Sequence, residues 1–272
     1  MVTVSEILLA SDFSGRSDRP LDRALQLAGQ WGSHLVIAHV IERGEGEVSE
    51  RERARFRSDL PDAAEGAELV LARGSAPKML AQLATERQSG LVVVGVARFN
   101  SIGDYFLGTA VDHILRNVSM PVLIVKRRVR GGYSRIVVAT DLSDCSREAL
   151  LAALDLFPQA HVGLLHVFHV PFEGLHRSDD MKEYALEEAR RELGDFLEHP
   201  EIAAHRDRIE PLIREGEVAN EVARALDDTS ADLLVAGTHG RSRLAAALGS
   251  QAERLLQTAG TDVLVVRERN GR

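Results

Sequence analysis

Short apolar runs alternate along the chain with longer segments in which apolar residues recur every three or four positions. The short runs predict buried strands, and the longer period predicts amphipathic helices. In the first half the expected strands cover residues 6–12, 34–40, 68–74, 90–95 and 121–126, and the expected helices cover 17–30, 48–60, 76–87 and 108–117. This alternation predicts an α/β fold with a parallel sheet and helices on both faces.

The same order of segments then begins again. RIVVATD repeats EILLASD, so Asp141 matches Asp12, and GLLHV repeats VIAHV, so His166 matches His39. The segments DLLVAG and GLVVVG, LGS and LGT, and VLVVR and VLIVK correspond in the same order. Solenoid repeats are shorter than these copies, so each copy has the size of a domain.

The sequence therefore predicts two tandem five-stranded parallel-sheet domains, at residues 1–128 and 135–272, with a linker at 129–134. The junction KRRVRGGYS at 126–134 holds four basic residues and a Gly-Gly pair. We interpret it as a solvated, flexible linker, because a nucleic-acid patch would need support from basic residues elsewhere.

Composition narrows the class of function. The 272 residues are 44% hydrophobic and 27% charged, with a net charge of -8. The acidic balance argues against nucleic acid or an anionic membrane as a partner. We expect a cytoplasmic protein, because the start lacks a signal-peptide pattern, no apolar run reaches about 18 residues, and one cysteine allows no internal disulfide.

A glycine-rich loop in the second copy could bind phosphate. Gly237 ends an expected strand, Gly240 follows, and Gly249-Ser250 opens a helix in which Ser250 and Glu253 form a capping-box pattern. Free N–H groups at a helix start favour an anion, and glycine lets the backbone approach it closely. The alternative is that these residues only make the turn that any strand-to-helix connection needs.

The expected sheet brings three further positions to this loop. Asp141, Val167 and Gly237 end the first, second and fourth strands of the second copy. Ligands of open parallel sheets bind at the carboxyl ends of strands, where the connections diverge. There an aspartate could accept hydrogen bonds from a ribose or base, and the backbone of Val167 could read a base edge.

These blocks together resemble the universal stress protein family. In the second half the matching blocks are IVVATDLSDCSREALLAALDL, GLLHVF, IREGEVANEVARAL, ADLLVAGTHGRSRLAAALGSQAERLL and DVLVVR. In the first half they are ILLASDFSGRSDRPLDRALQLA, LVIAHV, GLVVVG and YFLGTAVDHILRNVSMPVLIVK. The resemblance implies two domains of the adenine-nucleotide α-hydrolase type, packed as a pseudo-twofold pair through their last strands. Many members bind ATP through a Gly-x2-Gly-x9-Gly-Ser/Thr motif.

Both copies depart from that motif. In the second copy eight residues separate Gly240 from Gly249, and in the first copy the nine-residue spacing before Gly108-Thr109 is kept but Arg98 replaces the second glycine. An arginine side chain would crowd phosphates at that position, unless its guanidinium contacts them. The resemblance therefore assigns a main adenine-nucleotide site to Asp141, Val167, Gly237, His239, Gly240, Gly249, Ser250 and Gln251, and a weaker one to Asp12, Val40, Gly95, Gly108 and Thr109.

The resemblance implies a stress-response regulator that binds ATP, ADP or AMP, with or without magnesium, and signals through a protein partner. The alternatives are an interaction scaffold with both sites closed and, ranked last, a slow ATPase or adenylate-handling enzyme. The sequence offers no catalytic residues and no metal ligands. The paired domains allow a further homodimer of chains.

Two other features have simpler interpretations. We expect His166 and His169 to point to opposite faces of a strand, which would keep them from sharing a metal. We expect Cys145, beside the main site, to be a small core residue.

Overall fold

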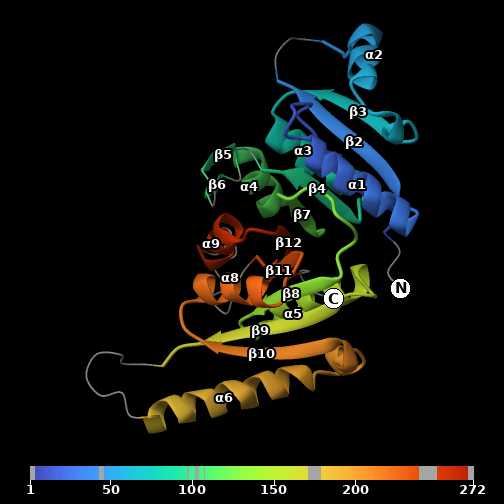
Figure 1. The fold of residues 1–272 in the computed structure, drawn as a ribbon. Coiled ribbons are helices and arrows are strands. Elements are labelled where there is room, and N and C mark those ends of the chain that lie inside the picture. Colours follow the sequence, from blue (N-terminus) through green and yellow to red (C-terminus); the bar gives the residue numbers. More distant parts are fainter. Residues whose placement is uncertain are drawn as a thin grey trace. The chain divides into compact units, whose positions relative to one another are not determined.

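The computed structural model describes residues 4–42, 46–96, 98–101, 104–106, 108–170, 179–238 and 250–268. The chain divides into two compact units, Met1–Gly132 with Asp262–Val265 and Tyr133–Thr261 with Val266–Arg272. In both units strands alternate with helices along the chain (Figure 1).

The first unit holds a sheet in the order β3-β2-β1-β4-β7-β12. Its strands are β1 (Glu6–Ala10), β2 (His34–Ile41), β3 (Glu68–Arg73), β4 (Leu91–Gly95), β7 (Val122–Val125) and β12 (Asp262–Val266). Its helices are α1 (Asp18–Trp31), α2 (Glu50–Ser58), α3 (Ala76–Glu86) and α4 (Gly108–Asn117), with a 3-10 turn η1 (Asp62–Ala64). The pairs β1–β2, β2–β3, β1–β4 and β4–β7 are parallel.

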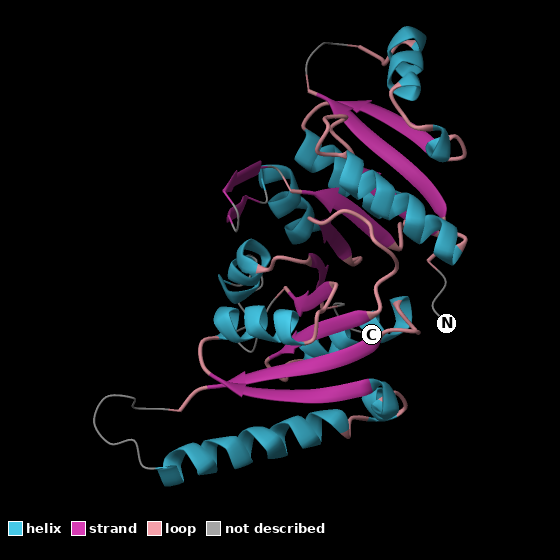
Figure 2. Ribbon diagram, viewed as in Figure 1, coloured by secondary structure: helices cyan, strands magenta, loops and turns pink. Residues whose placement is uncertain are grey.

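Burial explains the continuous apolar runs of the central strands. Ile7, Leu8 and Leu9 follow one another in β1, and each is 0% exposed. Successive strand residues face opposite sides of a sheet, so both faces of β1 are covered. Helix α1 packs against β1 and β4, while α3 packs against β2 and α4 (Figure 2). Gly32 ends α1 in the left-handed conformation, with φ of 68°.

A short hairpin occupies part of the segment in which the sequence predicted only a loop. Strand β5 (Arg98–Ser101) pairs antiparallel with β6 (Asp104–Phe106), just before α4 begins at Gly108. The first repeat therefore keeps the nine-residue motif spacing but includes a hairpin within it.

The second unit repeats this order in four parallel strands, β10-β9-β8-β11. Its strands are β8 (Arg135–Thr140), β9 (His161–Phe168), β10 (Ile209–Glu215) and β11 (Leu233–Gly237). Its helices are α5 (Asp144–Leu156), α6 (Asp179–Leu197), α7 (Pro200–Ala203), α8 (Val218–Asp228) and α9 (Ser250–Thr258), with a 3-10 turn η2 (Arg206–Arg208). Helix α5 packs against β8 and β11, and α6 packs against β9 and β10. The α/β class and the tandem organisation are confirmed.

The two repeats also match in backbone detail. Gly74 and Gly216, which follow the third strand of each repeat, have φ of 137° and 146°. Phe13 and Leu142, which follow the matched aspartates, have φ of 54° and 64°. Positive φ is uncommon outside glycine, so its recurrence at matched positions shows that both copies build the same turn.

The last strands of the two repeats pair, as predicted. Strand β12 lies antiparallel to β7, with Val263 opposite Ile124 and Val265 opposite Val122. A buried ionic cluster joins them to α1: Asp262 Oδ2 lies 3.4 Å from Arg23 Nη2, and Asp262 Oδ1 accepts hydrogen bonds of 2.8 Å from the main-chain N–H groups of Lys126 and Arg127.

The prediction of a solvated junction is wrong at two of its positions. Lys126 is 1% exposed because it follows β7 directly, beside Asp262. Tyr133 is 6% exposed and packs edge-on against Phe157, with ring centroids 5.3 Å apart. The carbonyl of Gly131 accepts a 2.8 Å hydrogen bond from Arg23. Basic and aromatic side chains with long apolar portions can be buried when their polar ends find partners, which composition alone does not reveal.

Among the described helices, none combines the length and the apolar character needed to cross a membrane.

Candidate functional site

Strand register brings the expected site positions of each repeat to one edge of its sheet. In the first repeat β1 lies between β2 and β4, with Ala10 opposite Ala38 and Leu9 opposite Val93. In the second repeat β8 lies between β9 and β11, with Thr140 opposite His166 and Ala139 opposite Ala236. These are the places where strand order reverses, which is where open α/β sheets bind ligands.

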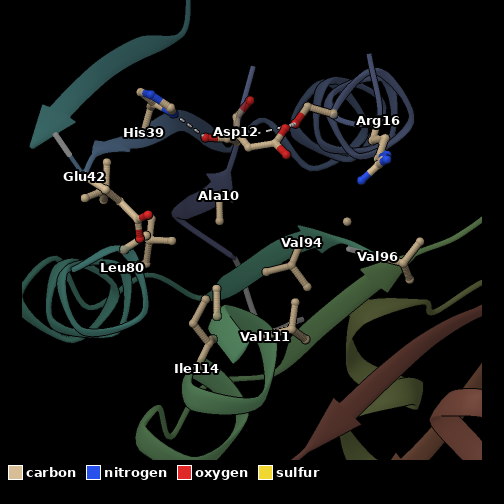
Figure 3. A pocket seen from close by; sticks show the side chains of 16 residues that line it. Ala10, Asp12, Arg16, His39, Glu42, Leu80, Val94, Val96, Val111 and Ile114 are labelled. Atoms are coloured by element: carbon tan, nitrogen blue, oxygen red, sulfur yellow. Dashed lines mark hydrogen bonds between the residues drawn. The ribbon is translucent and has the colours of Figure 1, made fainter. Parts of the chain in front are cut away.

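A pocket of about 390 Å³ opens at this edge in the first repeat (Figure 3). This first-repeat pocket is lined by Ala10, Ser11, Asp12, Arg16, Ser17, His39, Val40, Glu42, Ala76, Leu80, Val94, Gly95, Val96, Ala110, Val111 and Ile114. Pockets for small ligands commonly have about 300–1,000 Å³ and apolar walls with a few polar groups. Three of the residues expected for the weaker site, Asp12, Val40 and Gly95, are among them.

Asp12 is fixed by the turn that follows β1. Its Oδ1 accepts hydrogen bonds from the Ser14 main chain (2.9 Å), the Ser14 hydroxyl (2.7 Å) and the Ser17 hydroxyl (2.6 Å). Burial by itself would raise the pKa of Asp12, but these hydrogen bonds and the charge of Arg16 hold that pKa below its usual value. Asp12 is therefore an ionised, oriented acceptor at neutral pH.

His39 forms another wall of the first-repeat pocket. Its Nδ1 donates to the carbonyl oxygen of Ser11 over 2.8 Å, because a carbonyl can only accept. The rings of Phe13 and Phe56 pack against it, with centroids 5.2 and 4.6 Å from the imidazole. Packing and hydrogen bonding thus hold the imidazole in one orientation beside Asp12.

The second repeat builds the same turn around Asp141. Its Oδ1 accepts from the Ser143 main chain (3.2 Å) and the Ser143 hydroxyl (2.6 Å). His166 Nδ1 donates to the carbonyl of Thr140 over 3.2 Å, as His39 does to Ser11. Val167 and Gly237 lie in β9 and β11 on either side. The role of these residues in binding a nucleotide stays a prediction.

The remaining expected site residues are described only in part. His239, Gly240 and Gly249 lie outside the described residues. Helix α9 begins at Ser250, as the capping-box pattern predicted, and Gln251 is exposed on it. In the first repeat α4 begins at Gly108-Thr109.

Cys145 is a core residue, as expected. It is 2% exposed, and its Sγ contacts the Thr238 hydroxyl and the Val266 carbonyl at 3.9 and 3.8 Å. It also explains why position 237 is glycine. A Cβ there would lie 2.8 Å from Cys145 Sγ and 3.2 Å from its carbonyl oxygen.

We expect Gly237→Ala to destabilise the second unit by about 1–3 kcal/mol, because the added methyl group would press on the Cys145 main chain. Urea unfolding followed by circular dichroism measures the loss. The matched control is Gly194→Ala in α6, where a Cβ meets nothing within 4 Å and the helix should gain about 0.5–1 kcal/mol. Equal stability of the two variants would contradict the packing argument.

The expectation that His166 and His169 face opposite sides is wrong. Strand β9 ends at Phe168, so His169 lies beyond the alternation of the strand. Both histidines line one cavity of about 650 Å³ with the α6 residues Tyr184 and Glu188. Within the described part of the chain, no three His, Cys, Asp or Glu side chains are grouped so that they could hold a metal.

Sequence reasoning missed five polar residues of the first-repeat pocket, of which Ser11 and Ser17 belong to the turn that holds Asp12 and the other three have ionisable side chains. Arg16, His39 and Glu42 line it with Asp12. All three lie at or just beyond the carboxyl end of β1 or β2, so the rule that selected Asp12 and Val40 could have selected them too. Their side-chain directions needed the structure.

Comparison with known proteins agrees with this architecture. The sequence profile of the universal stress protein family matches residues 3–126 and 132–267. A curated universal stress protein from Methanocaldococcus jannaschii is 32% identical over 165 residues, which cover 56% of this chain and 94% of the relative.

Solved structures extend the similarity across both repeats. A universal stress protein from Archaeoglobus fulgidus superposes with a TM-score of 0.70 at 17% identity, covering 98% of this chain and 99% of its own. A Pseudomonas aeruginosa protein described as functionally unknown gives 0.69 at 20% identity, with 97% and 92% covered. At 17–20% identity these structures support the fold alone. Membership of the family rests on the sequence profile, which matches nearly the whole chain. This chain therefore belongs to the universal stress protein family, whose domain it contains twice.

Proposed function

We propose that this protein binds an adenine nucleotide at the carboxyl ends of its parallel strands and acts as a nucleotide-dependent regulator in a stress response. The observation that carries the proposal is the first-repeat pocket, where Asp12, Val40 and Gly95 line one cavity at the switch point of the sheet. An oriented carboxylate suits ribose or base hydroxyl and amino groups, and the apolar walls suit a base.

The second repeat supports a similar site. Asp141 is held by the same turn as Asp12, and α9 begins at Ser250, so the main-chain N–H groups of its first turn have no acceptor within the helix itself. The notable difference lies in the loops, because the second repeat keeps Gly240 of the motif whereas the first has Arg98. We propose the second repeat as the main ATP site and the first as a further adenine-nucleotide site.

Calorimetric titration of the nucleotide-stripped protein with ATP, with and without magnesium, tests this proposal. We expect the parent protein to bind ATP saturably. Removing the aspartate of one site should weaken the affinity of that site about tenfold to hundredfold, because hydrogen bonds to a charged group contribute about 1.5–3 kcal/mol. The variants are Asp12→Ala and Asp141→Ala, and the control is Asp155→Ala, an exposed α5 residue.

A further variant, Gly240→Arg, copies the first repeat into the second and should remove one binding event. Absence of any adenine-nucleotide binding would overturn the proposal and favour an interaction scaffold. Steady-state phosphate release above background, lost in Asp141→Ala, would instead favour a slow ATPase.

A further inference from the structure

Arg16 lies at the end of the first-repeat pocket where the glycine motif begins. It lines the pocket with Gly95 and Val96. A Cβ at Gly95 would lie 3.8 Å from the carbonyl oxygen of Arg16 and 2.8 Å from Pro20 Cγ. This close approach places the main chain of Arg16 against the carboxyl end of β4.

The pocket carries opposite charges at different places. In Figure 3 Arg16 and Val96 lie on one side, and Glu42 with Leu80 lies on the other. Of the described lining residues, Arg16 alone bears a guanidinium or ammonium group, while Asp12 and Glu42 are carboxylates. An anionic group of a ligand would be repelled near Glu42, so the Arg16 side is the place that favours it.

Arg16 lies on the turn that holds Asp12. Asp12 accepts three hydrogen bonds at Oδ1 from Ser14 and Ser17, and the charge of Arg16 also stabilises the carboxylate. Arg16 is exposed, and its main-chain N–H bonds to the Ser14 hydroxyl at 3.3 Å. An arginine on an anchored turn can offer two parallel N–H groups to phosphate oxygens.

The second repeat has no cation at the corresponding position. Counting from the matched aspartates, Arg16 corresponds to Cys145. A Cβ at Gly95 would approach the Arg16 carbonyl as a Cβ at Gly237 would approach the Cys145 carbonyl, but Cys145 is 2% exposed and carries no cationic group. The positive charge is thus particular to the first repeat.

We propose that Arg16 binds a phosphate group of the nucleotide in the first-repeat pocket, so that this pocket selects phosphorylated ligands over the nucleoside. The inference rests on the proposed nucleotide function and adds a residue that determines which ligand the first repeat accepts. It also assigns the phosphate contact to the turn after β1, beside Gly95, where the glycine motif of the first repeat begins.

The test is a calorimetric titration with adenosine, AMP and ADP in an Asp141→Ala background, which weakens the second site. The variants are Arg16→Gln, Arg16→Lys and the control Arg51→Gln, an exposed arginine of α2. Arg16→Gln should bind AMP and ADP about tenfold to hundredfold more weakly, with adenosine binding changed less than about twofold. Arg16→Lys should recover part of the loss, and the loss should shrink at high salt.

The outcomes separate the two proposals. An equal loss for adenosine and AMP would show that Arg16 only shapes the pocket, and an unchanged AMP affinity would show that it does not contact phosphate. Either result overturns this inference while nucleotide binding stands. Failure of the parent protein to bind any of the three ligands would overturn the proposed function itself.

Discussion

Replacing Asp262 with alanine should destabilise the first unit by about 3–5 kcal/mol. Asp262 is 1% exposed and Arg23 is 4% exposed, so their ion pair is removed from water. The substitution deletes a buried carboxylate while the guanidinium remains in place. It also removes the acceptor of two main-chain N–H groups, at Lys126 and Arg127.

The measurement is urea unfolding followed by the fluorescence of Trp31, the single tryptophan, which ends α1 in the same unit as Arg23. The matched control is Asp112→Ala, which removes the exposed Asp112–Arg116 pair of α4 and should cost only about 0.3–0.5 kcal/mol.

A double substitution sharpens this test. Arg23→Leu combined with Asp262→Leu should lose less stability than the sum of the single changes, because neither charge then remains buried alone. Strict additivity, or a loss in Asp262→Ala no larger than in Asp112→Ala, would contradict the assignment of a buried ionic cluster.

The stability of the first unit should rise with pH above neutrality because of Lys126. Burial lowers the pKa of Lys126 to about 7, and the nearby charge of Asp262 opposes this only in part. In the unfolded chain the amine has its ordinary pKa of 10.5. Between about pH 7 and 10.5 the unfolded state therefore binds more protons than the folded state.

By linkage, the free energy of unfolding increases with pH across this window by up to about 1.4 kcal/mol per unit, for a total on the order of 5 kcal/mol. Below about pH 7 Lys126 is protonated in both the folded and the unfolded state, so it adds no further pH dependence to the free energy of unfolding. Lys126→Met keeps a long side chain but removes the titrating amine, so we expect its stability to vary less with pH.

Urea unfolding of parent and variant from pH 6.5 to 9.5, again followed through Trp31, checks this expectation. The relevant quantity is the difference between the two proteins, because other titrating groups contribute equally to both. A difference that stays constant over this range would show that Lys126 does not titrate in it. Lys78→Met, at an α3 position, serves as the control.

Much of the candidate site could be predicted from sequence order. The rule that ligands lie at the carboxyl ends of parallel strands selected Asp141, Val167 and Gly237. The resemblance carried the assignment to Asp12, Val40 and Gly95 as a weaker site, and these three line the first-repeat pocket. Arg16 and Glu42 were missed because strand order places a residue at an edge but does not determine the direction of its side chain.

Errors in the fold predictions arose where long-range contacts override local composition. The basic junction looked solvated, yet Lys126 is buried because β12, more than a hundred residues later in the chain, brings Asp262 beside it. His169 was assigned to a strand that ends at Phe168, so the alternation of faces did not apply to it. The β5–β6 hairpin was not predicted, although the turn-forming residues Asn100, Ser101, Gly103 and Asp104 lie in its segment.

The sequence by itself determined the α/β class, the duplication and the succession of strands and helices along the chain, because apolar periodicity and repeated blocks are local properties of a chain. The turn at Asp12 and Asp141, where serines two residues later donate to the carboxylates, was found in the structure and was not predicted. Only the tertiary structure decided the register of β7 with β12, the buried Arg23–Asp262 cluster and the position of Arg16 in the pocket. These features depend on contacts between segments far apart in sequence, whose free energies come from desolvation and packing that no single segment contains.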